Sequence, residues 1–489
     1  MKKNMLFMKD GLFFLICVGL GILAEELLFK GAIGISGPVF IVAFYMVFFL
    51  KLSGEAFRGQ RLNLLVFLSI WSIAFSYMLH TNPILRGLNY LVLPMLIVVQ
   101  LTLSSSNSKT LKWYNIGFIG YIIRKIGLAF KYNQRFISRV IHSVFKGVNE
   151  QTFHLTKRIL VGLCIAVPFG LIVTSLLMSA DLKFANLISQ LPQWSIQWIN
   201  QELVLRLVLI LFITLGLFGY FQAVSKKDIH VKSSQKSLSI KWDGVVALTV
   251  LIMLNGVYTL FTLIQFKYFF GQTLQGDLTY AVYARRGFAE LIVVTVLNLT
   301  VLVSVLSFVK LGGSKLWTFL QFMLSLLVVY SGILLVSAYM RLSMYEEAYG
   351  FTMLRLLVQA FMLFLALIFV YTLVTIWLNR LSLVRFYLIS GLVFYAVLNL
   401  VPLDQMVIQN NLTRLDQTGK IDVNYLNRMS SNGVICLVNL YKKQPALPGL
   451  RKTLELDKIE AVNDHSGWRS FNFEKQRANK LLKEIDLKR

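Results

Sequence analysis

The chain has 489 residues, of which 56% are hydrophobic and 15% charged, and its mean hydropathy is +0.66. This composition excludes a soluble globular protein. The formal net charge of +26 does not indicate nucleic-acid binding, because the basic residues lie in loops between apolar runs rather than on one soluble face.

Apolar runs long enough to cross a bilayer recur along most of the chain. The first run is interpreted as a retained span rather than a signal peptide, because Glu25 and Glu26 end it without a small-residue cleavage site. The sequence predicts an all-α, polytopic membrane protein with about eleven transmembrane helices, near residues 12–28, 33–50, 62–79, 85–103, 159–178, 203–223, 245–265, 288–309, 316–339, 354–378 and 383–401.

These spans divide the chain into four regions. Residues 1–103 form an N-terminal four-span region, and residues 104–158 form a basic segment that is too polar to cross the membrane. Residues 159–401 form a seven-span core, and residues 402–489 form a small helical tail.

Lysine and arginine are unequally distributed between alternate loops. One set of loops holds 25 of them and the other set holds 8. The positive-inside rule places the first set in the cytoplasm. The prediction is therefore a cytoplasmic N-terminus and an extracytoplasmic C-terminal tail.

The basic segment contains an amphipathic helical pattern. Its apolar positions are Phe136, Ile137, Val140, Ile141, Val144 and Val148, with Arg135, Arg139, His142 and Lys146 between them. One interpretation is a helix that lies on the lipid bilayer at its anionic inner leaflet. The other is a cytoplasmic helical hairpin packed against the spans.

The predicted outward face carries an unusual polar cluster, because few charges normally lie this close to the hydrocarbon. Two loops contribute to it, and its members are Tyr280, Tyr283, Arg285, Arg286, Glu290, Arg341, Tyr345, Glu346, Glu347, Tyr349 and Arg355. One interpretation is an ion-pair network that locks the span ends and docks the tail. The alternative is a pocket in which Arg285 and Arg341 bind an anionic headgroup or carboxylate, with Glu346 or Glu347 as a proton acceptor.

Motifs of known catalytic, cofactor and metal sites are missing from the sequence. The five histidines are scattered, so each is interpreted as a surface or interfacial side chain, and no metal site or cofactor is predicted. No two of the three cysteines are expected at the same depth relative to the membrane, so no disulfide is expected. In the tail, helices are predicted over residues 403–415, 423–441 and 473–485, with Pro445 and Pro448 as breaks.

Several of these motifs resemble a bacterial family of polytopic membrane proteins known as a domain of unknown function, of the 4173/4153 type. The first motif runs from Tyr280 to Glu290 and includes Ala284-Arg285-Arg286-Gly287-Phe288, and the second runs from Arg341 to Arg355. The tail adds a Gly-Lys-Ile-Asp motif ending at Asp422, and a motif with Trp468, Arg469 and Asn472. The chain departs from the family pattern at two places: the family tends to have Asn-Pro before Asp404, where this chain has Pro402-Leu403, and an acidic residue where this chain has Asn432. The resemblance implies a bacterial cell (inner) membrane protein and no particular reaction.

Three functions are compatible with these features. The leading hypothesis is a non-enzymatic envelope scaffold, sensor or partner of another membrane protein. The second is a transporter or lipid-handling protein with an outward polar pocket. The third is a membrane enzyme that acts on an anionic or lipid-linked substrate at the outer leaflet.

Overall fold

The computed structural model describes residues 2–52, 61–105, 113–144, 201–225, 242–270, 288–309, 315–378 and 381–487, with single positions between 162 and 184. In these residues all regular secondary structure is helical, apart from one isolated bridge between Trp242 and Val309. The predicted all-α class is therefore confirmed.

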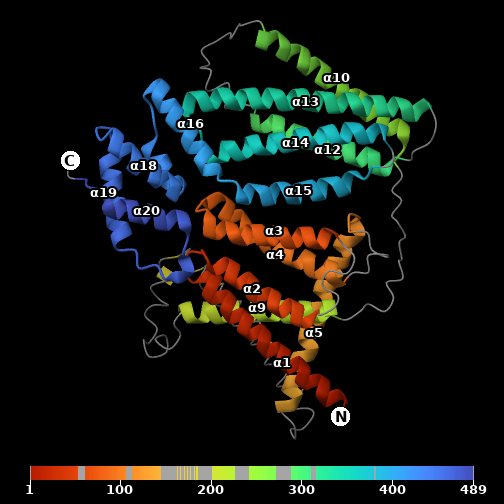
Figure 1. Ribbon diagram of the computed structural model, residues 1–489. Coiled ribbons are helices and arrows are strands. Elements are labelled where there is room, and N and C mark those ends of the chain that lie inside the picture. The colour runs from red at the N-terminus through yellow and green to blue at the C-terminus, as the bar shows by residue number, and fades with distance from the viewer. Residues whose placement is uncertain are drawn as a thin grey trace. The chain divides into compact units, whose positions relative to one another are not determined.

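Most of the predicted spans are present as helices (Figure 1). Within the described ranges, nine helices are long and apolar enough to cross a membrane, and the shorter apolar helix α2 (Ser36–Lys51) accounts for a tenth predicted segment. The predicted span at 159–178 falls almost entirely outside the described residues. These helices form a multi-pass α-helical membrane protein.

The chain folds as two compact units, and the first comprises Met1–Leu64, Met95–Ile229 and Gly467–Ser470. Arg206 lies inside a span of this unit, where the Nε of its guanidinium is 3.4 Å from Oε1 of Glu25. The main helices of the unit are α1 (Lys2–Ala24), the π-helical turn η1 (Glu25–Phe29), α2, α5 (Ile116–Val144) and α9 (Gln201–Ser225).

Helix α5 corresponds to the predicted amphipathic helix of the basic segment. It packs against α9, where Nζ of Lys125 donates to the Ala223 carbonyl at 2.7 Å and Nδ2 of Asn133 donates to the Leu215 carbonyl at 2.9 Å. A different face of α5 remains exposed and apolar, at Ile119, Ile123, Ile126 and Phe130. The helix therefore packs on a span along one face and keeps an exposed apolar surface on another.

The second unit comprises Leu65–Pro94, His230–Ser466 and Phe471–Arg489. Its long central helix α13 (Lys315–Tyr349) packs against α10, α12 and α14 around a core of apolar side chains. The other spans in this unit are α10 (Gly244–Phe270), α12 (Phe288–Phe308), α14 (Met353–Trp377), α15 (Leu383–Leu400), most of α3 (Arg61–Leu79) and the first half of α4 (Pro83–Ser105).

Polar side chains inside these spans bond helix to helix. Nδ2 of Asn255 in α10 donates to the Met323 carbonyl of α13 at 3.0 Å. Asn298 of α12 accepts a hydrogen bond from Tyr258 at 2.6 Å and donates to Ser331 at 3.0 Å. In hydrocarbon such bonds are a common means of holding helices together.

The C-terminal module, residues 402–466 and 471–487, gathers at one end of α13, α14 and α15 (Figure 1). Its core contains Leu426, Leu437, Val438, Leu450 and Leu454, each no more than 1% exposed. The helices of the module are α16 (Leu403–Thr418), α17 (Val423–Met429), α18 (Ser431–Lys443), α19 (Leu450–Val462) and α20 (Phe473–Glu484), and the short η2 (Trp468–Ser470) belongs to the first unit.

The module differs from the prediction in two places. The single helix predicted over residues 423–441 is wrong, because Ser430 is extended and separates α17 from α18. A helix was also missed after Pro448: α19 follows Gly449, whose positive φ of 79° is readily adopted by glycine.

Candidate functional site

The predicted outward cluster divides into described and undescribed residues. Tyr280, Tyr283, Arg285 and Arg286 lie outside the described residues. Glu290 is exposed in the first turn of α12. The remaining members lie on the last turns of α13 and the first turn of α14.

Three of those remaining members, Tyr345, Glu346 and Arg355, form a corner between α13 and α14. Glu346 is 1% exposed, and its Oε2 accepts a hydrogen bond of 2.5 Å from Nε2 of Gln359. The guanidinium of Arg355 lies 4.0 Å from the ring centroid of Tyr345 and donates to the Gly350 carbonyl. These side chains therefore hold the two helices together.

The other three described members are Glu347, Tyr349 and Arg341, and the ring centroid of Tyr349 lies 4.9 Å from that of Tyr345. The side chains of Glu347 and Tyr349 are exposed, and Arg341 is half-buried one turn before Tyr345. The backbone carbonyl of Glu347, rather than its carboxylate, accepts a hydrogen bond from Arg414 of α16 at 3.2 Å. The described part of the cluster thus contacts the C-terminal module chiefly through backbone groups.

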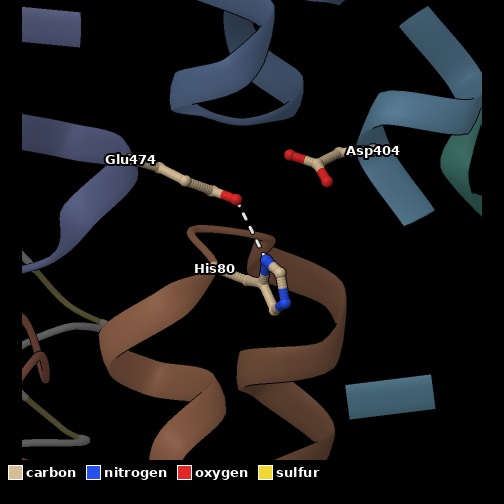
Figure 2. Close-up of side chains that lie close together, drawn as sticks. All are labelled: His80, Asp404 and Glu474. Atoms are coloured by element: carbon tan, nitrogen blue, oxygen red, sulfur yellow. Dashed lines mark hydrogen bonds and ion pairs between the residues drawn. The ribbon is translucent and has the colours of Figure 1, made fainter. Parts of the chain in front are cut away.

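A second polar site, which the sequence interpretation missed, lies where α3, α16 and α20 meet (Figure 2). His80 follows the last residue of α3, Asp404 is in the first turn of α16, and Glu474 is in the first turn of α20. One ligand atom of each residue lies within 4.8 Å of those of the other two. We refer to these three residues as the His80 cluster.

Glu474 has the most contacts in the His80 cluster. Its Oε1 lies 3.0 Å from Nδ1 of His80 and accepts a bond of 2.7 Å from Nδ2 of Asn432. Its Oε2 accepts from the backbone N–H of Thr81 at 2.9 Å and from the Thr81 hydroxyl at 3.0 Å. Oδ2 of Asp404 accepts from the same Asn432 amide at 2.8 Å, so this amide lies between the two carboxylates.

Both carboxylates are shielded from solvent. Asp404 is 3% exposed and also accepts a bond of 2.8 Å from the Ser430 hydroxyl. The side chains of His80 and Glu474 are 16% and 11% exposed. Burial opposes the charged form of His80, but the bond to Glu474, the Leu400 carbonyl and the charge of Asp404 outweigh it, so the pKa of His80 is raised.

The backbone around His80 is fixed by side chains from the module and from α4. Nδ2 of Asn472 donates to the Tyr77 carbonyl at 2.9 Å and to the His80 carbonyl at 3.2 Å, while its Oδ1 caps α20 at the Lys475 N–H. The guanidinium of Arg86 donates to the His80 carbonyl at 2.9 Å. The turn that carries the imidazole is therefore positioned from both sides.

The other two residues of the predicted tail motif lie in the first unit. Trp468 is 63% exposed, and Arg469 pairs with Glu26 of η1. Of the tail motif, therefore, Asn472 is the member that supports the His80 cluster.

Comparison with known families identifies the chain. A family model described as "Domain of unknown function (DUF4153)" matches residues 67–440. The chain belongs to the DUF4153 family. This confirms the predicted family. The comparisons with curated proteins and with solved structures found no match.

The DUF4153 match covers part of the His80 cluster. His80, Asp404 and Asn432 lie inside it, whereas Glu474 and Asn472 lie beyond its end. Sequence spacing alone could not have indicated this site, because His80 and Glu474 are 394 residues apart. Its only signal was the placement of a histidine and two carboxylates at predicted helix ends.

Proposed function

We propose that this DUF4153 protein is a non-enzymatic membrane scaffold or sensor that holds a helical module at the ends of its spans and presents it to another membrane protein. The observation that supports this proposal is the way in which the module is attached. Its core is contiguous with the span ends, and Tyr425, Asn411 and Asn472 at the junction bond to backbone groups at those ends.

The junction involves several helices of the second unit. The Tyr425 hydroxyl accepts a bond of 2.6 Å from the Met353 N–H at the start of α14. Asn411 bonds both backbone groups of Phe351, accepting at 3.1 Å and donating at 2.9 Å. Because buried backbone groups are costly to leave unpaired, each such bond opposes detachment of the module.

The described polar groups favour this role over the two alternatives. Glu346 is buried and bonded to Gln359 of the neighbouring helix, which is typical of a carboxylate that holds two helices together. Asn255 and Asn298 bond neighbouring helices, as expected of structural polar residues.

In-cell photo-crosslinking tests the scaffold role. A photo-crosslinker is placed at Leu456 or Ile459 of α19, which are 60% and 61% exposed, and at the buried Leu454 of the same helix as a matched control. We expect a discrete adduct with another membrane protein from the exposed positions and none from Leu454. If a scan over the exposed positions of the intact module gives no discrete adduct, the scaffold proposal is wrong.

We also propose that the protein lies in a bacterial cell (inner) membrane, with a cytoplasmic N-terminus and an extracytoplasmic C-terminal module. The three-to-one distribution of lysine and arginine between alternate loops supports this orientation. Reporter fusions after Val401 test it, since an enzyme that works only outside the cytoplasm should be active there. Activity solely of a cytosolic reporter at that position contradicts the orientation.

For α5 we propose contact with the anionic inner leaflet. The exposed residues Ile123 and Phe130 lie seven positions apart on one face, and Lys131 and Arg135 lie on another. An apolar face beside a basic one is typical of interfacial helices.

An environment-sensitive dye attached at Phe130→Cys in the full-length protein tests this contact. We expect its emission to shift to the blue in anionic nanodiscs, and a dye at Arg135→Cys to report water. Equal emission from the two positions contradicts the proposal.

A further inference from the structure

The hydrogen bonds of His80 pose a specific problem of proton placement. Its Nε2 lies 3.2 Å from the Leu400 carbonyl, which can only accept, so Nε2 carries a proton. Its Nδ1 lies 3.0 Å from a carboxylate oxygen of Glu474, another acceptor. A neutral imidazole would therefore direct a lone pair at a carboxylate, so this position requires either one further proton between the two atoms or a metal ion.

The surroundings of Nδ1 have the composition of a metal site. Two carboxylates converge on the imidazole from separate helices, and their ligand atoms lie within 4.8 Å of one another (Figure 2). In a tetrahedral zinc site with bonds of about 2.0–2.2 Å, neighbouring ligand atoms are roughly 3.3 Å apart. Nδ1 of His80 and Oε1 of Glu474 are already 3.0 Å apart, and the ligand atom of Asp404 lies within 4.8 Å of the ligand atoms of both residues.

Asn432 adds a fourth group at the same place. Its amide nitrogen lies 2.8 Å from Asp404 and 2.7 Å from Glu474. Rotation of the amide by half a turn exchanges nitrogen for oxygen at this point, and the two orientations have nearly the same shape. The amide would then offer an oxygen to a cation instead of a proton to the carboxylates.

The proposed ligands are themselves held by hydrogen bonds, as the ligands of known metal sites usually are. A metal-binding imidazole usually donates its other N–H to a carbonyl or carboxylate, as Nε2 of His80 does to Leu400. Ligating carboxylates are usually hydrogen-bonded as well, and here Ser430 holds Asp404 while Thr81 holds Glu474.

We propose that His80, Asp404 and Glu474, together with the amide oxygen of Asn432, bind one divalent transition-metal ion, with zinc as the best fit. One imidazole with oxygen ligands suits zinc better than calcium or magnesium, which take oxygen ligands alone. Two carboxylates also match the charge of a divalent cation. Because His80 lies in the turn after α3 and the other ligands come from α16, α18 and α20, the ion would fasten the C-terminal module to the turn between α3 and α4.

Metal titration of the purified full-length protein tests the proposal. The protein is prepared with a histidine-free affinity tag, treated with chelator, and titrated with zinc chloride by calorimetry, with bound metal counted by mass spectrometry. We expect one zinc ion per chain with a dissociation constant below about 1 µM, and a melting temperature that rises with zinc.

Variants locate the ion. His80→Gln and Glu474→Gln keep side-chain size and should weaken binding by more than 100-fold. Ser430→Ala removes a bond behind a ligand and should weaken it by about 10–100-fold. The matched control is His465→Gln, because His465 is an exposed histidine outside the His80 cluster and its loss should leave affinity unchanged.

Two results overturn the proposal. The first is that the wild-type protein binds no zinc, manganese or iron stoichiometrically. This result overturns the proposal whether or not the variants fold. The second is that His80→Gln and Glu474→Gln leave zinc binding unaffected, or that His465→Gln weakens it equally. The ion would then bind elsewhere on the surface.

Discussion

Asn472 offers the sharpest test of how the C-terminal module is attached. The residue is 3% exposed and makes three bonds, two to the backbone carbonyls of Tyr77 and His80 and one that caps α20. Loss of an N-cap costs about 1 kcal/mol. Each lost bond to a buried carbonyl adds roughly 0.5–1.5 kcal/mol.

The Asn472→Ala substitution should therefore destabilise the attached state by about 2–4 kcal/mol. Since 1.4 kcal/mol corresponds to a factor of ten, the detached population should rise by roughly 30–700-fold. When opening is fast relative to cleavage, the rate of proteolysis follows that population. Limited proteolysis of the protein in detergent or nanodiscs, with fragments identified by mass, measures the rate.

Two further variants separate the contributions at Asn472. Asn472→Ser keeps a capping oxygen and loses both donated bonds, so its cleavage rate should lie between wild type and Asn472→Ala. Asn463→Ala, at an exposed position just after α19, should change stability by less than about 0.5 kcal/mol. If Asn472→Ala is cleaved at the wild-type rate, the bonds to Tyr77 and His80 do not hold the module.

Two other predictions concern the interior and the surface of the module. Gly433→Ala places a Cβ against the Leu426 carbonyl and should destabilise the module by at least about 2 kcal/mol in thermal unfolding. The control is Gly256→Ala, which has open space around it and should not destabilise α10. Equal melting temperatures of the two variants would contradict the close approach of α17 and α18. The second prediction concerns Asp464, whose pKa is held below its ordinary range by the bond to Lys475. This stabilisation, about 1 kcal/mol for a partly exposed pair, is therefore present above about pH 4 and lost as the pH falls towards the lowered value. Asp464→Asn should remove that acid-dependent part of the protease resistance, and an unchanged pH profile would refute the assignment.

The spans could be predicted from the sequence because each depends on a local property. A run of about twenty apolar residues predicts a transmembrane helix whatever surrounds it. All predicted spans within the described ranges are helices. The helix of the predicted 316–339 span is longer than the span, since α13 continues to Tyr349 through Arg341 and Glu346. Hydropathy marks only the apolar part of such a helix, and the bond of the buried Glu346 to Gln359 is a tertiary contact that hydropathy does not show.

The helices of the module were harder to predict because their signals are short. Leu450, Leu454 and Ala461 give α19 a buried face, but the preceding Pro448 was read as the end of helical structure. The break at Ser430 has no strong local signal. Its position is fixed by tertiary contacts, since the hydroxyl of Ser430 bonds Asp404 and the adjacent N–H of Ser431 bonds Thr81.

The α13–α14 corner and the His80 cluster depend differently on docking of the module, because their residues lie at different separations in the sequence. Gln359 and Glu346 are 13 residues apart, so their bond shapes a single helical corner and can persist whether or not the module is attached. His80 and Glu474 are 394 residues apart, so their contact exists only while the module is docked. Any movement of the module relative to the turn after α3 must therefore break the His80 cluster and can leave the α13–α14 corner intact. If the protein is a sensor, its response should change the exposure of His80 and Glu474 more than that of Glu346, and hydrogen exchange at residues 77–84 against residues 343–350 would distinguish the two.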